Sequence, residues 1–419
     1  MACQIIPKND LDFRRDREAL RDALRAGTPD VTWYSQGFNP YPWTLEPREL
    51  HALERLLGSL RRAICALVNC YSRDVRLREL VLLSPEVEEL LRVADRRPYK
   101  LDAFRPDFVT AIDGTVEVSE INARFPLNGF LITHFLDRAL QETTSGRDFG
   151  SSFASLPSVA GVPQVLRDTV GDAERIVVLK GRERGWDVRI LMDAWPQCEA
   201  VAPDCWSGEQ KVSDFVVLEL HQEEIMETLP RSALLSLVEN GRYLNDVRTI
   251  FIGHDKRLLA ALTSEIVCDY LEADDVQRLR EHVIPTYVVG RGGEPVRRAR
   301  ANPEDWVLKP NLRGKGEGIV MGRHVSRGAW HSALDSAHPH FVLQRYVEQR
   351  SYDILTEVDG EVRTVPMNVV GLLPSLGEHS LGPGIFRASR EPIVNVSRGG
   401  TVLAPVVLTG RGRTDDTEA

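Results

Sequence analysis

Residues 306–322, WVLKPNLRGKGEGIVMG, place three alternating glycines between two short apolar runs. Apolar runs of this kind are typical of strands, whereas the glycine loops of P-loop and Rossmann proteins open a helix. The stretch therefore predicts a flexible loop between two antiparallel strands, in which glycines let backbone N–H groups approach phosphate oxygens closely. An ordinary hairpin with bulge glycines is the alternative. The glycines and basic residues of the loop and its flanks are Lys309, Arg313, Gly314, Lys315, Gly316 and Gly318.

The composition excludes several classes of partner. At 419 residues the length predicts two to three domains, with hydrophobic and charged fractions of 42% and 27% that are ordinary for a globular chain. A net charge of -9 argues against a nucleic acid held through its phosphates. No apolar run reaches the ~18 residues of a membrane span, and no secretory signal is visible, so we expect a cytoplasmic protein. The six scattered cysteines predict reduced thiols rather than a zinc site.

Apolar periodicity predicts an α/β (α+β) chain. Asp113-Gly114 joins two strand-like runs, 104–112 and 115–123, and such a dipeptide is a strong hairpin signal. Helices are expected at 47–71, 84–95 and 129–142. Further strand-like runs are expected at 175–181, 187–193, 214–220, the start of 251–265, 283–289 and much of 306–373, with a polar loop at 291–302. The last residues have no apolar content, so 406–419 is expected to be a disordered tail.

A second feature follows the glycine loop. Residues 340–354, HFVLQRYVEQRSYDI, contain an apolar strand that leads into a short connection able to present backbone groups to an adenine edge. A strand lysine, a glycine lid and such a hinge occur in this order in the ATP-grasp superfamily, which the motifs V-L-K-P, R-G-K-G-E-G and L-Q-R-Y-V-E resemble. The resemblance implies that Gln344, Tyr346 and Val347 hold adenine.

The E-x-N motif of that superfamily is absent after the hinge and lies near the other end of the chain. It is found in SEINARFPLNG as Glu120 and Asn122, and Arg105 and Asp107 precede it on the partner strand. An R-x-D strand followed by E-x-N resembles the circularly permuted ATP-grasp enzymes related to glutathionylspermidine synthase. GHDKRLLAALTSE, with Lys256, looks like the lysine-bearing helix start of these enzymes, and GPGIFRASREPIVNVSRGG resembles the N-x-x-R-G-G strand of glutamate-ligase-type ATP-grasp proteins.

The resemblance implies an ATP-grasp fold in circularly permuted order, with ATP held between two α+β subdomains. Segment 1–164 would combine an N-terminal helical region with the hairpin that binds magnesium. Segment 165–255 would form a small α/β domain of the pre-ATP-grasp kind, and 256–405 would supply the lid and hinge.

Magnesium prefers oxygen ligands, and Asp107, Glu120 and Asn122 are the candidates. Residues 120 and 122 share one face of a strand, and Asp107 can reach that face from the paired strand. The alternative is a surface hairpin with polar residues on its wet face. Arg105 would stabilise the transferring phosphoryl group or a tetrahedral oxyanion, or would instead form a salt bridge with Asp107.

The resemblance assigns the other candidates to phosphate and substrate. Arg387 is a second catalytic candidate, and Arg124, Asn395 and Arg398 are candidates for a substrate carboxylate. The ATP-binding candidates are Lys256, Lys309, Gly314, Lys315, Gly316, Gly318, Gln344, Tyr346 and Val347. Because arginine is the default cation of this chain, ordinary surface pairing is the alternative for each arginine.

The implied activity is that of an ATP-dependent carboxylate–amine ligase with ATP and Mg²⁺ as cofactors. It would join amino acids, or a peptide and an amine, through an acyl phosphate, as γ-glutamyl or dipeptide ligases of natural-product pathways do. The alternatives are a small-molecule kinase and a non-catalytic nucleotide-binding protein. Small-molecule substrates are the expected partners, with no nucleic acid and no membrane, and a homodimer is left open.

Overall fold

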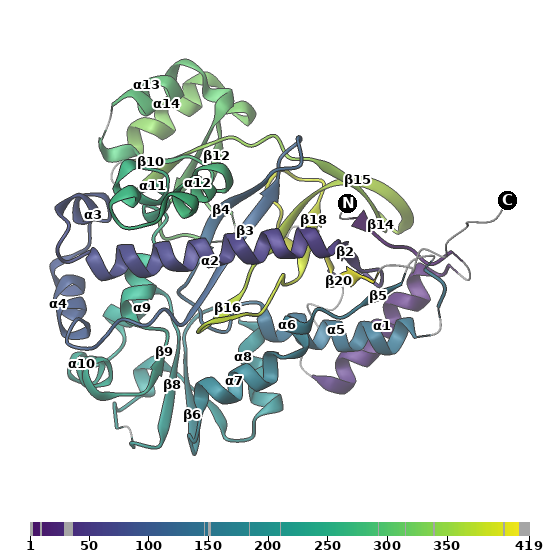
Figure 1. Ribbon diagram of the computed structural model, residues 1–419, viewed down its shortest axis with the longest axis horizontal. Coiled ribbons are helices and arrows are strands. Elements are labelled where there is room, and N and C mark those ends of the chain that lie inside the picture. Colours follow the sequence, from purple (N-terminus) through teal and green to yellow (C-terminus); the bar gives the residue numbers. More distant parts are fainter. Residues whose placement is uncertain are drawn as a thin grey trace.

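The computed structural model describes residues 3–8, 11–28, 37–145, 147–149, 152–183, 185–209, 211–291, 293–314, 316–337, 340–396 and 399–409. Over these residues the chain is an α+β protein with four sheets (Figure 1). No helix in this part of the chain combines the length and the apolar character needed to cross a membrane.

The largest sheet joins two distant parts of the chain. A hairpin of β3 (Ala103–Thr110) and β4 (Val116–Asn122) pairs through β3 with β15 (Glu361–Leu372), and all its pairings are antiparallel. The eight strands therefore come from both the 1–164 and the 256–405 segments. The other members are β14 (Ser351–Val358), β16 (Ser375–Leu376), β17 (His379–Ser380), β18 (Phe386–Ser389) and β19 (Thr401–Leu403).

The hairpin forms as the Asp113-Gly114 dipeptide predicts. Gly114 has a φ of 93°, which glycine adopts without strain. Asp107 lies opposite Glu120, and Arg105 lies opposite Asn122. Side chains at directly paired positions share one face of a sheet, so the two carboxylates face the same space.

Helix α2 (Pro47–Cys70) confirms the predicted helix at 47–71 and crosses the sheet as the longest helix in Figure 1. Its buried leucines share one hydrophobic core with Phe108 and Ile121 of the hairpin. Helix α4 (Pro85–Ala94) confirms the helix at 84–95, capped by the Ser84 hydroxyl, which accepts a hydrogen bond from the Val87 N–H. The remaining helices of this region are α3 (Val75–Leu80), α11 (Leu258–Leu262) and α12 (Ala273–His282).

The strand expected at the start of 251–265 is wrong, because Thr249–Gly253 forms a π-helical turn that leads to α11. Every residue of that turn is buried, so the run shows no alternation of apolar and polar residues. Without such a period, the sequence does not distinguish a strand from a helix here.

A four-stranded antiparallel sheet carries the glycine loop. Its strands are β10 (Thr286–Val288), β11 (Trp306–Pro310), β12 (Val320–Met321) and β13 (Phe341–Arg345), in the order β10-β13-β11-β12. The prediction of a glycine loop between antiparallel strands is thus confirmed, since β11 pairs with β12. Helices α13 (Glu294–Ala301) and α14 (Arg327–Ser336) lie beside this sheet, at the top of Figure 1.

The polar loop expected at 291–302 is wrong, because α13 occupies most of it. Glu294 forms ion pairs with Arg297 and Arg298 along one face, and Ala299 is its buried contact with the core. A helix stabilised by such pairs shows almost no apolar periodicity.

The third sheet is fully parallel. Its strands are β6 (Arg175–Lys180), β7 (Cys198–Val201), β8 (Asp214–Glu219) and β9 (Tyr243–Leu244), in the order β7-β6-β8-β9. The strand expected at 187–193 is wrong, because α8 (Trp186–Ala194) covers it. A short apolar run does not distinguish a buried strand from a buried helix. The other helices of this unit are α7 (Val162–Val170), α9 (Gln222–Glu227) and α10 (Arg231–Asn240).

The fourth sheet brings both ends of the chain together. It contains β1 (Cys3–Gln4), β2 (Trp43–Leu45), β20 (Pro405–Leu408) and β5 (Phe153–Ala154), in the order β1-β2-β20-β5. β20 occupies residues 406–408 of the expected tail, and 410–419 lie outside the described residues. Nearby, α1 (Phe13–Gly27) packs on α5 (Phe130–Thr144), which confirms the helix at 129–142, and α6 (Pro157–Ala160) follows (Figure 1).

Candidate functional site

A cavity of about 1320 Å³ lies where the hairpin, the glycine loop and the carboxyl ends of β6 and β8 meet. A small-molecule pocket typically measures ~300–1000 Å³, so this cavity has room for more than one ligand. Of the sequence-predicted site residues, all but four line it. Lys256 and Gly318 are outside that lining, and Lys315 and Arg398 lie outside the described residues.

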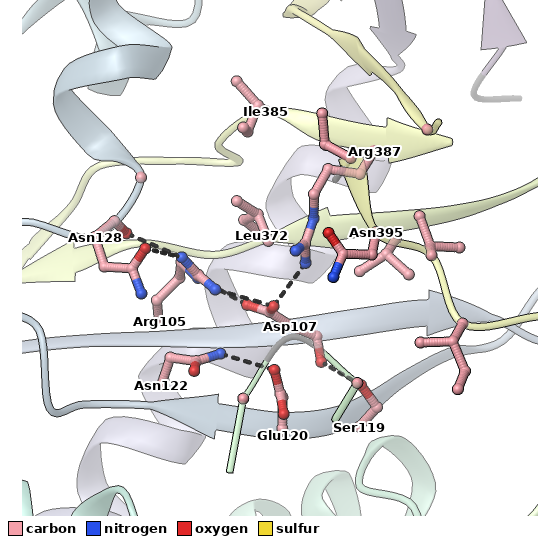
Figure 2. Close-up of a pocket in the computed structure, with 18 of the residues that line it drawn as sticks. Arg105, Asp107, Ser119, Glu120, Asn122, Asn128, Leu372, Ile385, Arg387 and Asn395 are labelled. Atoms are coloured by element: carbon pink, nitrogen blue, oxygen red, sulfur yellow. Dashed lines mark hydrogen bonds and ion pairs between the residues drawn. The ribbon is translucent and has the colours of Figure 1, made fainter. Parts of the chain in front are cut away.

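Asp107 is held by two arginines (Figure 2). Arg105 donates from Nε to Asp107 Oδ1 at 2.8 Å and from Nη2 to Oδ2 at 3.1 Å. Arg387, from β18, donates to the same Oδ2 at 2.7 Å. Burial alone would lower the pKa of Arg105, but the Asp107 carboxylate raises it. The salt bridge weighed as the alternative role of Arg105 is therefore formed, on the floor of the cavity.

The other end of the Arg105 guanidinium contacts Asn128 (Figure 2). Its Nη1 donates to the backbone oxygen of Asn128 at 3.3 Å and to the side-chain oxygen of the same residue. Asn128 thus fixes the guanidinium plane beside Asp107. Asn128 belongs to the SEINARFPLNG stretch, but nothing in its spacing along the sequence points to Arg105.

Glu120 lies between two lysines. Lys256 Nζ is 3.7 Å from Glu120 Oε2, and Asn122 donates to Glu120 Oε1 at 3.1 Å. Burial would raise the pKa of Glu120, but Lys256, Lys309, the Asn122 hydrogen bond and Arg105 together lower it to about 2. Glu120 is therefore ionised in the folded protein.

Lys309 stands on β11 and faces the hairpin. Its Nζ donates to the Ser119 backbone oxygen at 3.3 Å. Burial lowers the pKa of Lys309 to about 8, with Glu120 opposing and Lys256 reinforcing the shift. Two lysines thus compete for one carboxylate, and a further anion at this point would be stabilised by both.

Asp107, Glu120 and Asn122 fit a magnesium ion as a partial ligand set. All three offer oxygen, the donor that Mg²⁺ prefers, and Asp107 and Glu120 occupy facing positions of the hairpin. The Asn122 amide nitrogen points at Glu120, which leaves its oxygen as the available donor. No three His, Cys, Asp or Glu side chains gather into a metal cluster within the described ranges. The set therefore suits an ion that draws its other ligands from phosphate and water.

The glycine loop is fastened at its base. Lys256 Nζ donates to the Arg313 backbone oxygen at 2.8 Å, and the Lys256 N–H donates to the Asn311 side chain at 2.8 Å. Arg124 donates to the Leu312 backbone oxygen at 2.9 Å. Lys256 therefore binds the base of the glycine loop and also pairs with Glu120.

The tip of the loop touches the opposite wall of the cavity. Gly316 and Gly318 have φ values of 72° and 71°, a conformation that glycine adopts at little cost. A Cβ on Gly316 would lie 2.5 Å from Ile393 Cγ2, on the segment that follows β18. Gly316 therefore lies against Ile393, which lines the opposite side of the cavity.

Some polar groups of the expected adenine hinge already form hydrogen bonds within the protein. Gln344 is buried, and its amide nitrogen donates to the Ser119 backbone oxygen at 3.1 Å and to the Thr286 hydroxyl at 3.0 Å. The Tyr346 N–H donates to the Asp305 backbone oxygen at 2.8 Å, so it is not available to a base. Tyr346 and Val347 still line the cavity.

The candidates for a substrate carboxylate lie on two sides of the cavity. Asn395 lies beside Arg387 (Figure 2). Arg124 is buried, and its guanidinium stacks on Phe125 at 4.6 Å from the ring centre. Burial lowers the pKa of Arg124, and Glu183 and Glu120 oppose this shift. Arg124 therefore lies in the electric field of both the hairpin and the carboxyl edge of the parallel sheet.

Two buried carboxyl groups of this cavity were missed in the sequence. Asp187, at the start of α8, accepts hydrogen bonds from the N–H groups of Gly129, Leu131 and Ile132 at 2.9, 2.8 and 3.1 Å. Glu219, at the end of β8, accepts from the Leu127 N–H at 3.0 Å. An acidic residue that ends an apolar strand run was the available signal for Glu219.

Comparisons with known proteins bear on the fold. The family described as AnkG N-terminal domain matches residues 56–210, which is less than half of the 419 residues. No curated protein matches the sequence. Among solved structures, a glutathione synthetase-like effector from Globodera pallida, GSS30, is similar with a TM-score of 0.60 and 12% identity, over 96% of this chain and 100% of that one. At this identity the similarity concerns the fold alone, and the chain shares the overall fold of that effector.

Proposed function

We propose that the protein is an ATP-dependent carboxylate–amine ligase with a circularly permuted ATP-grasp core. The observation that carries the proposal is the pair of facing carboxylates, each of which interacts with two cations beside the glycine loop. Asp107 lies between Arg105 and Arg387, and Glu120 between Lys256 and Lys309. Such a site offers positive charge to phosphates and oxygen ligands to the metal that accompanies them.

The chain order supports the permuted arrangement. The hairpin with Asp107 and Glu120 precedes β11, β13 and the glycine loop in the sequence, although all of them line one cavity. The fold similarity to a protein named a glutathione synthetase-like effector points the same way.

ATP would occupy the space between the hairpin and the sheet of β10 to β13. Lys309, which lines the cavity, would contact the phosphates, and the buried Lys256 would add positive charge from outside the lining, since both ammonium groups act on Glu120. Mg²⁺, held by Asp107, Glu120 and Asn122, would neutralise phosphate charge. The lysines would then neutralise phosphate charge, and Asp107, Glu120 and Asn122 would hold the metal.

The two arginines would act on the reacting groups. Arg105 is oriented by Asp107 and Asn128, and Arg387 reaches the same carboxylate from β18. Donors fixed in this way stabilise the charge that develops on a transferring phosphoryl group and on the oxyanion that follows.

The reaction would proceed in two transfers. A substrate carboxylate oxygen attacks the γ-phosphorus of ATP, the bond to the β–γ bridging oxygen breaks, and ADP leaves. A neutral amine then attacks the carbonyl carbon of the acyl phosphate, the C–N bond forms, and the carbon–oxygen bond to phosphate breaks. The amine proton is released to phosphate or solvent. Closure of the glycine loop would exclude water that hydrolyses the acyl phosphate.

The test is ADP release from Mg²⁺-ATP with a panel of single amino acids, amines and their pairs. Wild type is expected to release ADP only when a carboxylate and an amine substrate are both present, and Glu120→Gln is expected to lose at least ~100-fold of that rate. Glu117→Gln is the matched control, because Glu117 stands on the same strand and does not line the cavity. Failure of wild type to bind Mg²⁺-ATP would refute the proposal, and ADP release with a single hydroxyl substrate would establish a kinase instead.

A further inference from the structure

The segment 127–132 leads into the first turn of α5 and borders the cavity, and the parallel-sheet unit holds it in place. Asp187 accepts hydrogen bonds from three of its backbone N–H groups, and Glu219 accepts one from a fourth. The two acids are buried, with exposed fractions of 6% and 3%. The side chain of Asn128 therefore extends from a backbone that is fixed on both sides.

The amide of Asn128 uses its oxygen within the protein but not its nitrogen. Its Oδ1 and its backbone oxygen both accept from Arg105 Nη1. A guanidinium has donors and no acceptor, so the amide oxygen has to face Arg105, and Nδ2 forms the other branch of the amide (Figure 2). No described residue accepts a hydrogen bond from Nδ2.

The Asn128 amide nitrogen is also accessible to a ligand. Among the described residues, other donors of the cavity wall that lack a partner, such as Arg124 Nε and Arg387 Nε, have almost no accessible surface. Asn128 lines the cavity, and its Nδ2 does not belong to that buried set. Asn128 therefore presents amide N–H groups to the cavity, and the described chain supplies no acceptor for them.

Arg105 contributes an unused donor beside Asn128. Its five N–H groups make four hydrogen bonds in the described chain, two to Asp107 and two to Asn128, so one N–H remains. The other acids that act on Arg105 are Glu120 and Asp187, and each has partners of its own. Two side chains in contact thus offer free donors at one place in the cavity, which complements an oxygen atom of a ligand.

We propose that Asn128 is a catalytic residue whose Nδ2 donates, together with Arg105, to the carbonyl oxygen of the acyl phosphate. The inference rests on the proposed ligase function and adds a residue to it. When the neutral amine attacks the carbonyl carbon, the C–N bond forms and an electron pair moves to that oxygen, which becomes an oxyanion. The pair returns as the carbon–oxygen bond to phosphate breaks, and the amine proton passes to phosphate or solvent. Donors that are fixed beforehand stabilise such an oxyanion without reorganisation.

Two small probes of nearly the same shape test the site without turnover. Methyl acetylphosphonate is a stable analogue of an acyl phosphate and has the carbonyl oxygen, whereas methyl ethylphosphonate has a methylene group in its place. Both carry one negative charge at pH 7.5, and both are titrated into the full chain by calorimetry with Mg²⁺ present. Wild type is expected to bind the acetylphosphonate at least ~10-fold more tightly, because two donors meet its carbonyl oxygen.

Asn128→Asp and Asn128→Leu remove the donor in two different ways. Asn128→Asp keeps an oxygen for Arg105 Nη1, and its added charge weakens both probes alike, so the charge cancels in the ratio of the two affinities. Asn128→Leu adds no charge and keeps the backbone oxygen that Arg105 contacts. We expect the ratio to fall to ~3-fold or less in both variants, because only Arg105 still donates.

Asn69→Asp and Asn69→Leu are the matched controls. Asn69 is exposed on α2, its amide donates to the Cys65 backbone oxygen, and it lies outside the cavity lining. Both controls are expected to keep the wild-type ratio. Equal affinities of the two probes for wild type overturn the inference. An unchanged ratio in Asn128→Asp also overturns it, because Asn128 would then only orient Arg105, and so does an unchanged ratio in Asn128→Leu.

Mg²⁺-ATP binding, and amide formation with the substrate pair that the panel identifies, are measured on the same proteins. Both Asn128 variants are expected to lose ~100-fold in the rate of amide formation and to keep their affinity for Mg²⁺-ATP. If wild type forms an amide and the probe ratio does not depend on Asn128, the role of Asn128 is wrong while the proposed ligase stands. If the ratio behaves as expected and Mg²⁺-ATP does not bind, the site for a carbonyl oxygen is correct in a protein whose function is not ATP-dependent ligation.

Discussion

The Glu120 carboxylate attracts Lys256 and Lys309, which the phosphates of ATP would also attract. We therefore expect its negative charge to weaken the binding of ATP without metal and to strengthen the binding of Mg²⁺-ATP. In Glu120→Gln the lysines keep their charge and lose their carboxylate partner. We expect ATP in excess EDTA to bind this variant about tenfold more tightly than wild type, and Mg²⁺-ATP to bind about tenfold more weakly. Calorimetric titration with and without Mg²⁺ measures both values.

Glu117→Gln again serves as the control and is expected to match wild type in both titrations. A loss of affinity in EDTA as well as in Mg²⁺ would show that Glu120 does not restrain the lysines.

The sequence correctly predicted which hairpin residues share one face, but it did not predict the residues that surround them. The strand period and the Asp113-Gly114 turn were enough to put Asp107 and Glu120 on one face, as the pairing has them. Asn128 and Asp187 contribute through hydrogen bonds between segments that no spacing connects. The Tyr346 N–H, expected at adenine, is instead used by Asp305, a contact that only the folded sheet creates.

The glycine loop is the element whose closure the proposed reaction requires. In Gly316→Ala the side chain would meet Ile393 at 2.5 Å and would hold a φ of 72° that costs a non-glycine residue ~1–2 kcal/mol. We expect ADP release to fall about tenfold, because the loop spends less time closed. Steady-state kinetics with the substrates identified in the panel measures the change.

Gly360→Ala is a control for the backbone strain alone. Gly360 has a φ of 78° in the β14–β15 turn, with nothing within 4 Å of an added Cβ. It is expected to lose stability and keep its rate. Gly316→Ala combined with Ile393→Ala is expected to recover part of the rate, and no recovery would mean that closure against Ile393 is unimportant.

Among the elements, long helices and the hairpin were predictable, whereas α8 and α13 were not. Helix α2 shows a sustained apolar face, and a period repeated over many residues is unambiguous. α8 offers only a short apolar run, and α13 is covered by arginines that pair with Glu294. In both helices, packing and ion pairs decide the structure without leaving a pattern in the sequence.

For the molecule as a whole, the sequence predicted which motifs exist but not how three sheets share one cavity. The gathering of Asp107, Lys309 and Arg387 was implied by the ATP-grasp resemblance and not by any residue pattern. The pairing of β3 with β15 brings these segments together through contacts between distant parts of the chain. Such contacts depend on how all the buried surfaces fit at once, so they are not encoded in any local segment.

The buried acids at the end of the parallel sheet make the stability of the whole chain depend on pH. The groups that face Glu219 are Asp187, Glu183 and Lys180, together with the Leu127 N–H. Burial raises the pKa of Glu219 to about 8, so in the folded protein it is neutral at acidic pH. Its unfolded form ionises near the ordinary pKa of a glutamate, at ~4.3. The free energy of unfolding therefore falls as pH rises from ~4.3 to about 8, and it falls no further above that range.

Glu219→Gln removes that loss of stability without removing the acceptor for Leu127. We expect its midpoint of thermal unfolding to match that of wild type near pH 5 and to exceed it at pH 9 by on the order of 5 °C. Scanning calorimetry at both pH values measures the difference, and Glu378→Gln should follow wild type throughout, since its carboxylate is exposed. An equal offset at the two pH values would mean that Glu219 is ionised in the folded protein at both.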